Sequence, residues 1–498
     1  MTKETSFILP IFLSITHNIL AKICQSPFWG DGWGAARLAP TFGLYQGYSI
    51  FAPVNSGAVL NTVYAPLTYL VYLPAVWFPD ITSAIMAGTA IAILFFLLPV
   101  FLLLFRRDSV FLSLLLFAGF CLFALSSPPL AFSGFSIHAD APALGFSGLA
   151  AWATCRRSRN KKNWQDYLLS SIFAVAAVWT KQTMLPILIA IPVYLWFWAQ
   201  KEAIAYLKWL IFSLCLISLA LLLAFDPKDM FFNIITIPAA HPWRSLDRVQ
   251  ILLSALAELI QACAMPLAIL IIYGVINWKS LSAITRNHLR EWFRDKSWSL
   301  SLMIAIFLIP TTLLGRVKMG GVENTLSPTI YFLAIAALLV IQEMIQELIQ
   351  TSGKKWGIWL LLGIVSTATL IQSQPLNVLP DLVKALPANP QAVAYRYARD
   401  HPAEVYFPFN PLSHLFAEAK LYHFHYGLYD RQLAGEKISD AHFHAHIPKN
   451  LKLVAFPPKF PSKDLRKSPP MQYLKEFSEK INLPELPEWT VFSTPNQN

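Results

Sequence analysis

Long apolar runs constrain this chain more than any other feature of its sequence. Eleven such runs have about the length of 17–25 residues that a helix needs to cross the hydrocarbon core of a bilayer. They lie at residues 6–24, 81–105, 109–126, 140–155, 166–180, 183–199, 204–225, 250–278, 298–314, 328–347 and 356–373. We therefore predict an all-α polytopic membrane protein with about eleven transmembrane helices.

The composition excludes most other classes of protein. Of the 498 residues, 55% are hydrophobic and only 13% are charged, whereas a soluble domain has roughly 25% charged residues. Disordered, collagen-like and coiled-coil chains lack this much aliphatic and aromatic surface. The five cysteines show no CxxC or similar spacing and indicate neither a disulfide framework nor a metal centre.

The basic residues, which give a net charge of +11, indicate an orientation in the membrane rather than a nucleic-acid partner. With the N-terminus inside, 16 Lys and Arg residues lie in inner loops and 7 in outer loops. This bias is typical of the positive-inside rule. The apolar segment 63–79 then lies on the outer surface as a juxtamembrane segment, and we expect a multi-pass protein of a bacterial inner (plasma) membrane.

The composition changes after about residue 375, where Pro, Lys and Glu become frequent and apolar runs shorten to strand length, as in EVYFPF and LKLVAF. We predict a transmembrane domain over 1–375 and a small soluble α/β domain over 376–498 on the outer face. Histidines alternate in HFHYG and HFHAH, a pattern that on a strand would suit zinc or copper or would equally describe a half-buried strand. These histidines are His423, His425, His442, His444 and His446.

Asp31 is the first candidate catalytic residue. It lies in FWGDGWGAARLAP, just beyond the first apolar run, between glycines that let a ligand approach the backbone closely. A carboxylate here could act as a general base. The plainer alternative is a loop aspartate or helix N-cap that pairs with Arg37.

Asp140 is the second candidate catalytic residue. In HADAPALGF it stands where a short polar segment leads into the fourth apolar run. As an N-cap it would satisfy free helix amides, and Pro142 in the first turn fits this role. It could also orient an acceptor or, with His138 beside it, hold a divalent cation such as Mg²⁺ or Mn²⁺.

Candidate binding residues lie in three other predicted outer loops. Lys181, in WTKQT between two apolar runs, could either reach the lipid interface or bind a lipid phosphate. GRVKMGGVENTLSP places Arg316, Lys318 and Asn324 around a glycine pair, which suits an anionic headgroup and is equally common in ordinary loops. The segment 226–249, which contains Arg244, reads either as a lid over a membrane cavity or as a loop on the headgroups.

Together these motifs resemble polytopic GT-C glycosyltransferases. The motifs are the early Asp31, YAPLTYLVYLPAVWF at 64–78, HAD before the fourth run, and WTKQT, and they cover about residues 5–350. The most similar subgroup includes protein mannosyltransferases and aminoarabinose lipid transferases (glycosyltransferase family 39), and GGVENTLSP is similar to their late loop. Two positions depart from the pattern: Gly32 follows Asp31 where many members have an acidic pair, and Ala65 stands where a second Pro is usual.

The resemblance implies transfer of a sugar from a polyprenyl-phosphate-linked donor, at a site on the outer side of the bilayer, to a glycolipid, glycan or protein acceptor. By analogy, Asp31 would be the general base and Asp140 would position the acceptor or a cation. Lys181, Arg316 and Lys318 would stabilise charge on the phosphate, and Arg37, His138, Arg244 and Asn324 would contribute to substrate binding. Two alternatives stay open on the residues alone: a transporter or flippase of a lipid-linked or polar substrate, and a noncatalytic scaffold of the same fold.

Overall fold

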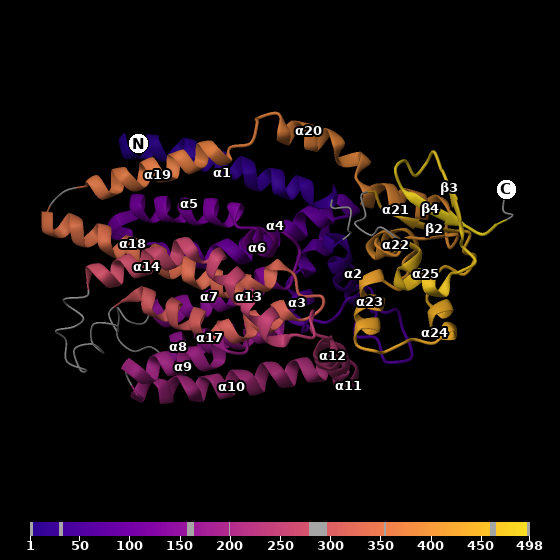
Figure 1. Ribbon diagram of the computed structural model, residues 1–498, viewed down its shortest axis with the longest axis horizontal. Helices are drawn as coiled ribbons and strands as arrows, with labels where there is room; N and C mark the ends of the chain where they lie inside the picture. Colours follow the sequence, from indigo (N-terminus) through magenta and orange to yellow (C-terminus); the bar gives the residue numbers. More distant parts are fainter. Residues whose placement is uncertain are drawn as a thin grey trace.

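The computed structural model describes residues 3–28, 33–156, 164–198, 200–277, 296–352, 355–458 and 465–495. A bundle of long helices forms most of the molecule, and the C-terminal residues with their small sheet lie at one end of it (Figure 1). We call this end of the bundle the sheet end. The long helices are α1 (Lys3–Gln25), α4 (Ile81–Leu104), α5 (Val110–Ser126), α7 (Asp140–Arg156), α8 (Trp164–Thr180), α9 (Ile187–Trp198), α10 (Gln200–Ala224), α13 (Arg248–Ala262), α14 (Ala264–Ile276), α17 (Ser297–Val317), α18 (Ser327–Ser352) and α19 (Trp356–Gln372).

Each of the eleven predicted runs contains helix. In the described part of the chain, six segments are long and apolar enough to cross a membrane, and the pair α13 and α14, bent by 70°, would make a seventh. Helices α9 and α19 are apolar but shorter than a full span. The structure thus confirms a multi-span helical protein, while the number eleven stays a prediction.

Short helices connect the long ones at the sheet end. They are η1 (Ser26–Phe28), α2 (Trp33–Tyr45), α3 (Leu67–Leu70), η2 (Leu73–Trp77), α6 (Pro128–Gly134), η5 (Gln182–Met184), α11 (Pro227–Phe231), the π-helical η6 (Phe232–Thr236), α12 (Ile237–Ala240) and η7 (Glu323–Leu326); η3 (Arg107–Ser109) joins α4 to α5. The apolar segment 63–79 forms α3 and η2, whose 11 residues from Leu67 to Trp77 reach only about 16 Å as a helix. This is about half of a bilayer core.

Two glycines let α7 pack tightly against α4. A Cβ atom at Gly145 would lie 2.6 Å from the carbonyl oxygen of Phe95, and one at Gly148 would lie 2.6 Å from Cβ of Pro99. Small residues allow this kind of close approach between apolar helices. The contact fixes where α7 begins, and α7 begins with Asp140.

A mixed sheet organises the C-terminal residues. The strands β1 (Val405–Tyr406), β2 (Leu453–Phe456), β3 (Glu479–Ile481) and β4 (Thr490–Ser493) are ordered β1-β2-β4-β3, with β1 parallel to β2 and the other neighbours antiparallel. The strands predicted in EVYFPF and LKLVAF are therefore present. Helices surround the sheet: α20 (Val378–Ala385), η8 (Leu386–Ala388), α21 (Pro390–Asp400), α22 (Pro411–Glu418), α23 (His425–Leu433), α24 (Asp440–Ala445), η9 (Leu465–Lys467) and α25 (Pro469–Tyr473).

The strand interpretation of the histidine motifs is wrong. HFHYG leads into helix α23, and HFHAH lies on helix α24. The Ser439 side chain accepts a hydrogen bond from the His442 amide and caps α24, a local interaction that favours helix over strand.

Candidate functional site

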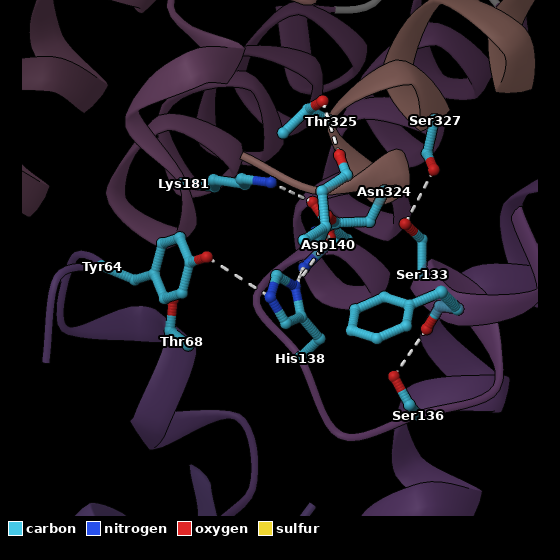
Figure 2. A network of polar contacts seen from close by, with 12 residues as sticks. Tyr64, Thr68, Ser133, Ser136, His138, Asp140, Lys181, Asn324, Thr325 and Ser327 are labelled. Atoms are coloured by element: carbon cyan, nitrogen blue, oxygen red, sulfur yellow. Dashed lines mark hydrogen bonds and ion pairs between the residues drawn. The ribbon is translucent and has the colours of Figure 1, made fainter. Parts of the chain in front are cut away.

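Four polar residues that the sequence singled out meet in one buried cluster at the sheet end (Figure 2). Asp140, at the first position of α7, forms an ion pair with Lys181, which lies between α8 and η5. Its other oxygen, Oδ2, lies 2.6 Å from Nδ1 of His138 and accepts a 2.5 Å hydrogen bond from Nδ2 of Asn324 in η7. All four side chains belong to residues that are at most 4% exposed. In the described residues, this carboxylate contacts side chains from three other segments rather than capping its own helix.

His138 is held as a neutral ring. Burial, together with the positive charge of Arg37, lowers the pKa of His138 to about 3. Nδ1 of His138 lies 2.6 Å from Oδ2 of Asp140 and accepts a 3.2 Å hydrogen bond from the Asp140 amide, and Nε2 lies 3.3 Å from the Tyr64 hydroxyl. The backbone carbonyl of His138 accepts a 2.8 Å hydrogen bond from the Tyr72 hydroxyl, so the ring is fixed on both sides.

Tyr64 lies between two cations. The guanidinium carbon of Arg37, on α2, is 5.5 Å from the centre of its ring, and Nζ of Lys181 is 5.7 Å from the same point. Both distances fit cation–π attraction, which is stronger away from water. Two positive charges therefore lie beside the Tyr64 ring, and one of them, that of Lys181, is paired with Asp140.

Asn324 is positioned by the start of α18. The Ser327 hydroxyl donates to the carbonyl of Pro129 at 2.8 Å and accepts from the Ser133 hydroxyl at 2.7 Å. These bonds fasten α18 to α6. The short helix η7, which carries Asn324, is thereby held against the start of α7.

An apolar cavity of about 750 Å³ lies beside this cluster. Its walls come from α8, η5, α10, α11 and η6, and they include Gln182 and Ala65, the chain neighbours of Lys181 and Tyr64. Nε2 of Gln182 donates to the carbonyl of Val63 at 3.0 Å and to that of Ile234 at 2.5 Å. One wall is the π-helix η6, a type of turn often found at functional sites. The residues next in the chain to Lys181 and Tyr64 therefore form part of the cavity wall.

Comparison with known proteins identifies the fold. No protein-family model and no curated protein sequence matches this chain. Two crystal structures of ArnT from Cupriavidus metallidurans, one bound to undecaprenyl phosphate and one in the apo state, match it over 98% of both chains. Their TM-scores are 0.59 and 0.58, at 10% sequence identity. The Archaeoglobus fulgidus oligosaccharyltransferase in complex with zinc and sulfate has a TM-score of 0.38 and 13% identity, over 88% of this chain and 67% of that one.

This chain has a GT-C-like fold. It is an integral, multi-pass membrane protein, as the apolar helices and the ArnT-like architecture both indicate. The match also extends through the C-terminal residues, which the sequence resemblance did not cover.

Three other predicted binding residues have their side chains or backbone engaged elsewhere in the GT-C-like fold. Nε of Arg316 donates to Glu258 at 2.6 Å. Nζ of Lys318 donates to the carbonyls of Pro238 and Ala239, at 3.1 and 2.7 Å. Arg244 is exposed and its amide donates to the Val317 carbonyl at 2.9 Å, next to a bridge between Trp243 and Lys318. These contacts hold the loop 241–247 against the end of α17.

Asp31, the predicted general base, lies outside the described residues. The predicted divalent cation at Asp140 does not fit the residues present there. Lys181 already places an ammonium on one carboxylate oxygen, and His138 and Asn324 take the other. A second cation would meet this ammonium, and among the described residues, which do not include Asp31, no further acidic ligand contacts Asp140.

Three histidines of the C-terminal residues lie close together: the ligand atoms of His423, His442 and His446 lie within 4.8 Å of one another. Their hydrogen bonds favour a structural role. The amide of Val59 donates to Nδ1 of His423 at 2.9 Å, so the proton of a neutral His423 is on Nε2 and neither nitrogen is free for a metal. Nε2 of His442 contacts the Gly57 carbonyl at 2.8 Å. The histidines thus attach the C-terminal residues to the loop 52–61.

The sequence reasoning missed several residues of the site. Tyr64 and Tyr72 were not among the candidate site residues, although both hydroxyls contact His138. Asn61 and Asp430, whose side chains are hydrogen-bonded to each other, were not considered. Tyr64 is the first residue of the YAPL motif, so its place in that motif was an available signal. No sequence motif distinguishes Asp430 from the other acidic residues after about residue 375.

Proposed function

We propose that this protein is a membrane glycosyltransferase that moves a sugar from a polyprenyl-phosphate-linked donor to an acceptor. The observation that carries this proposal is the buried Asp140 cluster directly beside an apolar cavity of about 750 Å³. A lipid-linked donor needs both, because its chain is apolar and its phosphate is charged. That ArnT, with the same fold, binds undecaprenyl phosphate supports the same class of donor here.

In this function the lipid chain occupies the cavity and its phosphate lies near Lys181. An ammonium has three N–H donors, and the ion pair with Asp140 leaves others for phosphate oxygens. Arg37, which also lies beside the Tyr64 ring, supplies a second positive charge. We assign the phosphate to these two cations rather than to Arg316, which is paired with Glu258, and Lys318, which is bonded to the carbonyls of Pro238 and Ala239.

The reaction follows from these positions. A hydroxyl of the acceptor attacks the anomeric carbon, the bond from that carbon to the phosphate oxygen breaks, and the phosphate leaves with the electron pair. Lys181 and Arg37 stabilise the charge that grows on it. Asp31 takes the proton of the acceptor as general base, and Asp140 positions Lys181, His138 and Asn324. No step needs a metal ion.

The position of the site suits a lipid substrate. Helices α4, α7 and α18 all begin at the sheet end, where the cluster lies (Figure 1). A donor anchored in the bilayer presents its phosphate at this level of a spanning helix. We place this end, with the C-terminal residues, on the outer face of a bacterial plasma membrane.

The test is turnover of radiolabelled polyprenyl-phosphate sugars by the purified protein in nanodiscs. We expect sugar release by the wild type, with and without a chelator, and a loss of about 10²–10³ in turnover for Asp31→Asn. Asp80→Asn is the matched control, because Asp80 caps α4 at the same end of the bundle by accepting from the Ser83 amide and Asn caps equally well. Normal turnover by Asp31→Asn would remove the base assignment.

A further inference from the structure

One helix of the C-terminal residues reaches into the region of the proposed site. Helix α23 lies against the loop 52–61: a Cβ atom at Gly427 would be 2.6 Å from the Leu60 carbonyl oxygen. Just before the helix, the Phe424 amide donates to the Val59 carbonyl at 2.9 Å. The close contact allows the next turn of α23 to present its side chains to the bundle.

Asp430, on that turn, is nine-tenths buried. Residues from two loops contact it. Nδ2 of Asn61 donates to its Oδ2. Its Oδ1 lies 3.8 Å from Nε2 of His241, and its backbone carbonyl lies 3.3 Å from the same nitrogen. Burial lowers the pKa of His241, so this ring is neutral at pH 7. The carboxyl of Asp430 therefore joins two segments of the membrane part that are about 180 residues apart.

The neighbouring residue Arg431 holds the wall of the cavity. Its guanidinium donates to the carbonyls of Ala52, Pro53 and Val54, at 3.1, 3.3 and 3.1 Å. It also lies 4.7 Å from the centre of the Phe232 ring. Because Val54 and Phe232 both line the cavity, α23 is attached to the proposed lipid site as well as to the loop 52–61.

Arg37 connects Asp430 to the Asp140 cluster. Burial raises the pKa of Asp430 to about 7, and the Asn61 hydrogen bond and the charge of Arg37 oppose this rise. The same Arg37 charge lowers the pKa of His138 and lies over the Tyr64 ring. The charge of Arg37 thus acts on Asp430 as well as on the cluster that we assign to the donor phosphate.

We propose that Asp430 is a positioning residue for sugar transfer: through its hydrogen bond from Asn61, the C-terminal residues hold the segment from Asn61 to Tyr64 in place beside the donor phosphate. This inference rests on the proposed function. The ionised carboxylate is the form that the hydrogen bond from Asn61 favours, so turnover should rise with pH through about 7. The charged and titratable groups that face Asp430 are Arg37 from α2, Tyr69 from α3, His241 from the loop after α12, and Arg431 on its own helix.

The test compares Asp430→Asn with the wild type in the nanodisc assay at pH 6, 7 and 8, with melting temperatures measured alongside. Asn keeps the acceptor for Asn61 and removes the charge. We expect kcat at pH 8 to fall on the order of 10-fold to 100-fold, the rise through pH 7 to disappear, and the melting temperature to stay equal or increase. Because burial opposes ionisation of Asp430, removing the charge relieves the folded state above pH 7. Asp440→Asn, at an exposed position on α24, should behave as the wild type.

Asn61→Ala is the second variant, in case Asp430→Asn does not fold. It removes a hydrogen bond that favours the ionised carboxylate, so the rise in turnover should move to higher pH. Wild-type kcat, KM and pH dependence in Asp430→Asn, or an unmoved inflection in Asn61→Ala, would overturn the inference and leave the proposed function intact. A wild-type protein that turns over no lipid-linked sugar would overturn both.

Discussion

At the scale of single residues, the site depends most on the ion pair between Asp140 and Lys181. Both residues are almost inaccessible to water, at 0% and 4% exposure. A buried charge is stable only when a partner and hydrogen bonds replace its water. The pair therefore couples the stability of the fold to the position of the cation that we assign to the donor phosphate.

Asp140→Asn should consequently impair both stability and activity. It leaves the Lys181 ammonium buried without its carboxylate, which destabilises a protein by about 3–5 kcal/mol. We expect turnover of the lipid-linked donor to fall by about 10²–10³, together with a lower melting temperature in detergent.

The double variant Asp140→Asn with Lys181→Met separates these two effects. It removes both charges, so we expect most of the melting temperature to return while donor turnover stays low. Recovery of turnover as well would mean that the pair serves folding alone.

Only some of the candidate site residues identified in the sequence meet in the Asp140 cluster. His138, Asp140, Lys181 and Asn324 each interrupt an apolar pattern, and all four converge. Arg316 and Lys318 show the same pattern, yet their donors go to Glu258 and to the carbonyls at the end of α12. Sequence position cannot separate these cases, because the partner lies on a different segment in each.

At the scale of elements, the packing of α7 on α4 sets the geometry of the site, because Asp140 is the first residue of α7. We predict that Gly145→Ala destabilises the protein by about 1–3 kcal/mol, since the new methyl group would force the two helices apart. Gly363→Ala on α19 is the matched control: a Cβ atom there meets nothing within 4 Å. It should be neutral or slightly stabilising in a helix. Equal melting temperatures for the two variants would contradict this packing.

The cavity gives a second prediction at this scale. Leu222, on α10, lines the cavity, whereas the next residue, Leu223, does not line it and is 79% exposed. Leu222→Trp should fill part of the proposed lipid site and raise the KM for the donor, whereas Leu223→Trp should leave it unchanged. Donor titrations of the two variants in nanodiscs provide the measurement, and an equal KM would place the lipid chain elsewhere.

Elements were easier to predict from the sequence than their ends or their partners. The apolar runs correspond to helices because a bilayer-length apolar segment must satisfy its own backbone hydrogen bonds. The bend of 70° between α13 and α14, at Cys263, leaves no mark in hydrophobicity. The histidine motifs were misread because the Ser439 cap outweighed a short alternating pattern.

At the scale of the whole molecule, the C-terminal residues are joined to the loops of the sheet end rather than attached as a separate appendage. Arg431, His423 and His442 all bond to the backbone of residues 52–59. This arrangement could not be predicted, because every contact pairs residues more than 350 positions apart and no local pattern marks them. It makes the loop 52–61 a shared element of both parts.

The central claim is that this molecule transfers a sugar and does not merely move a lipid across the bilayer. The most direct test is the chemical fate of a radiolabelled polyprenyl-phosphate sugar after incubation with the purified protein in nanodiscs. We predict that free polyprenyl phosphate accumulates as the sugar is released or transferred, and that Asp140→Asn abolishes this accumulation. Intact donor with correctly folded wild-type protein would contradict the account and favour a transporter.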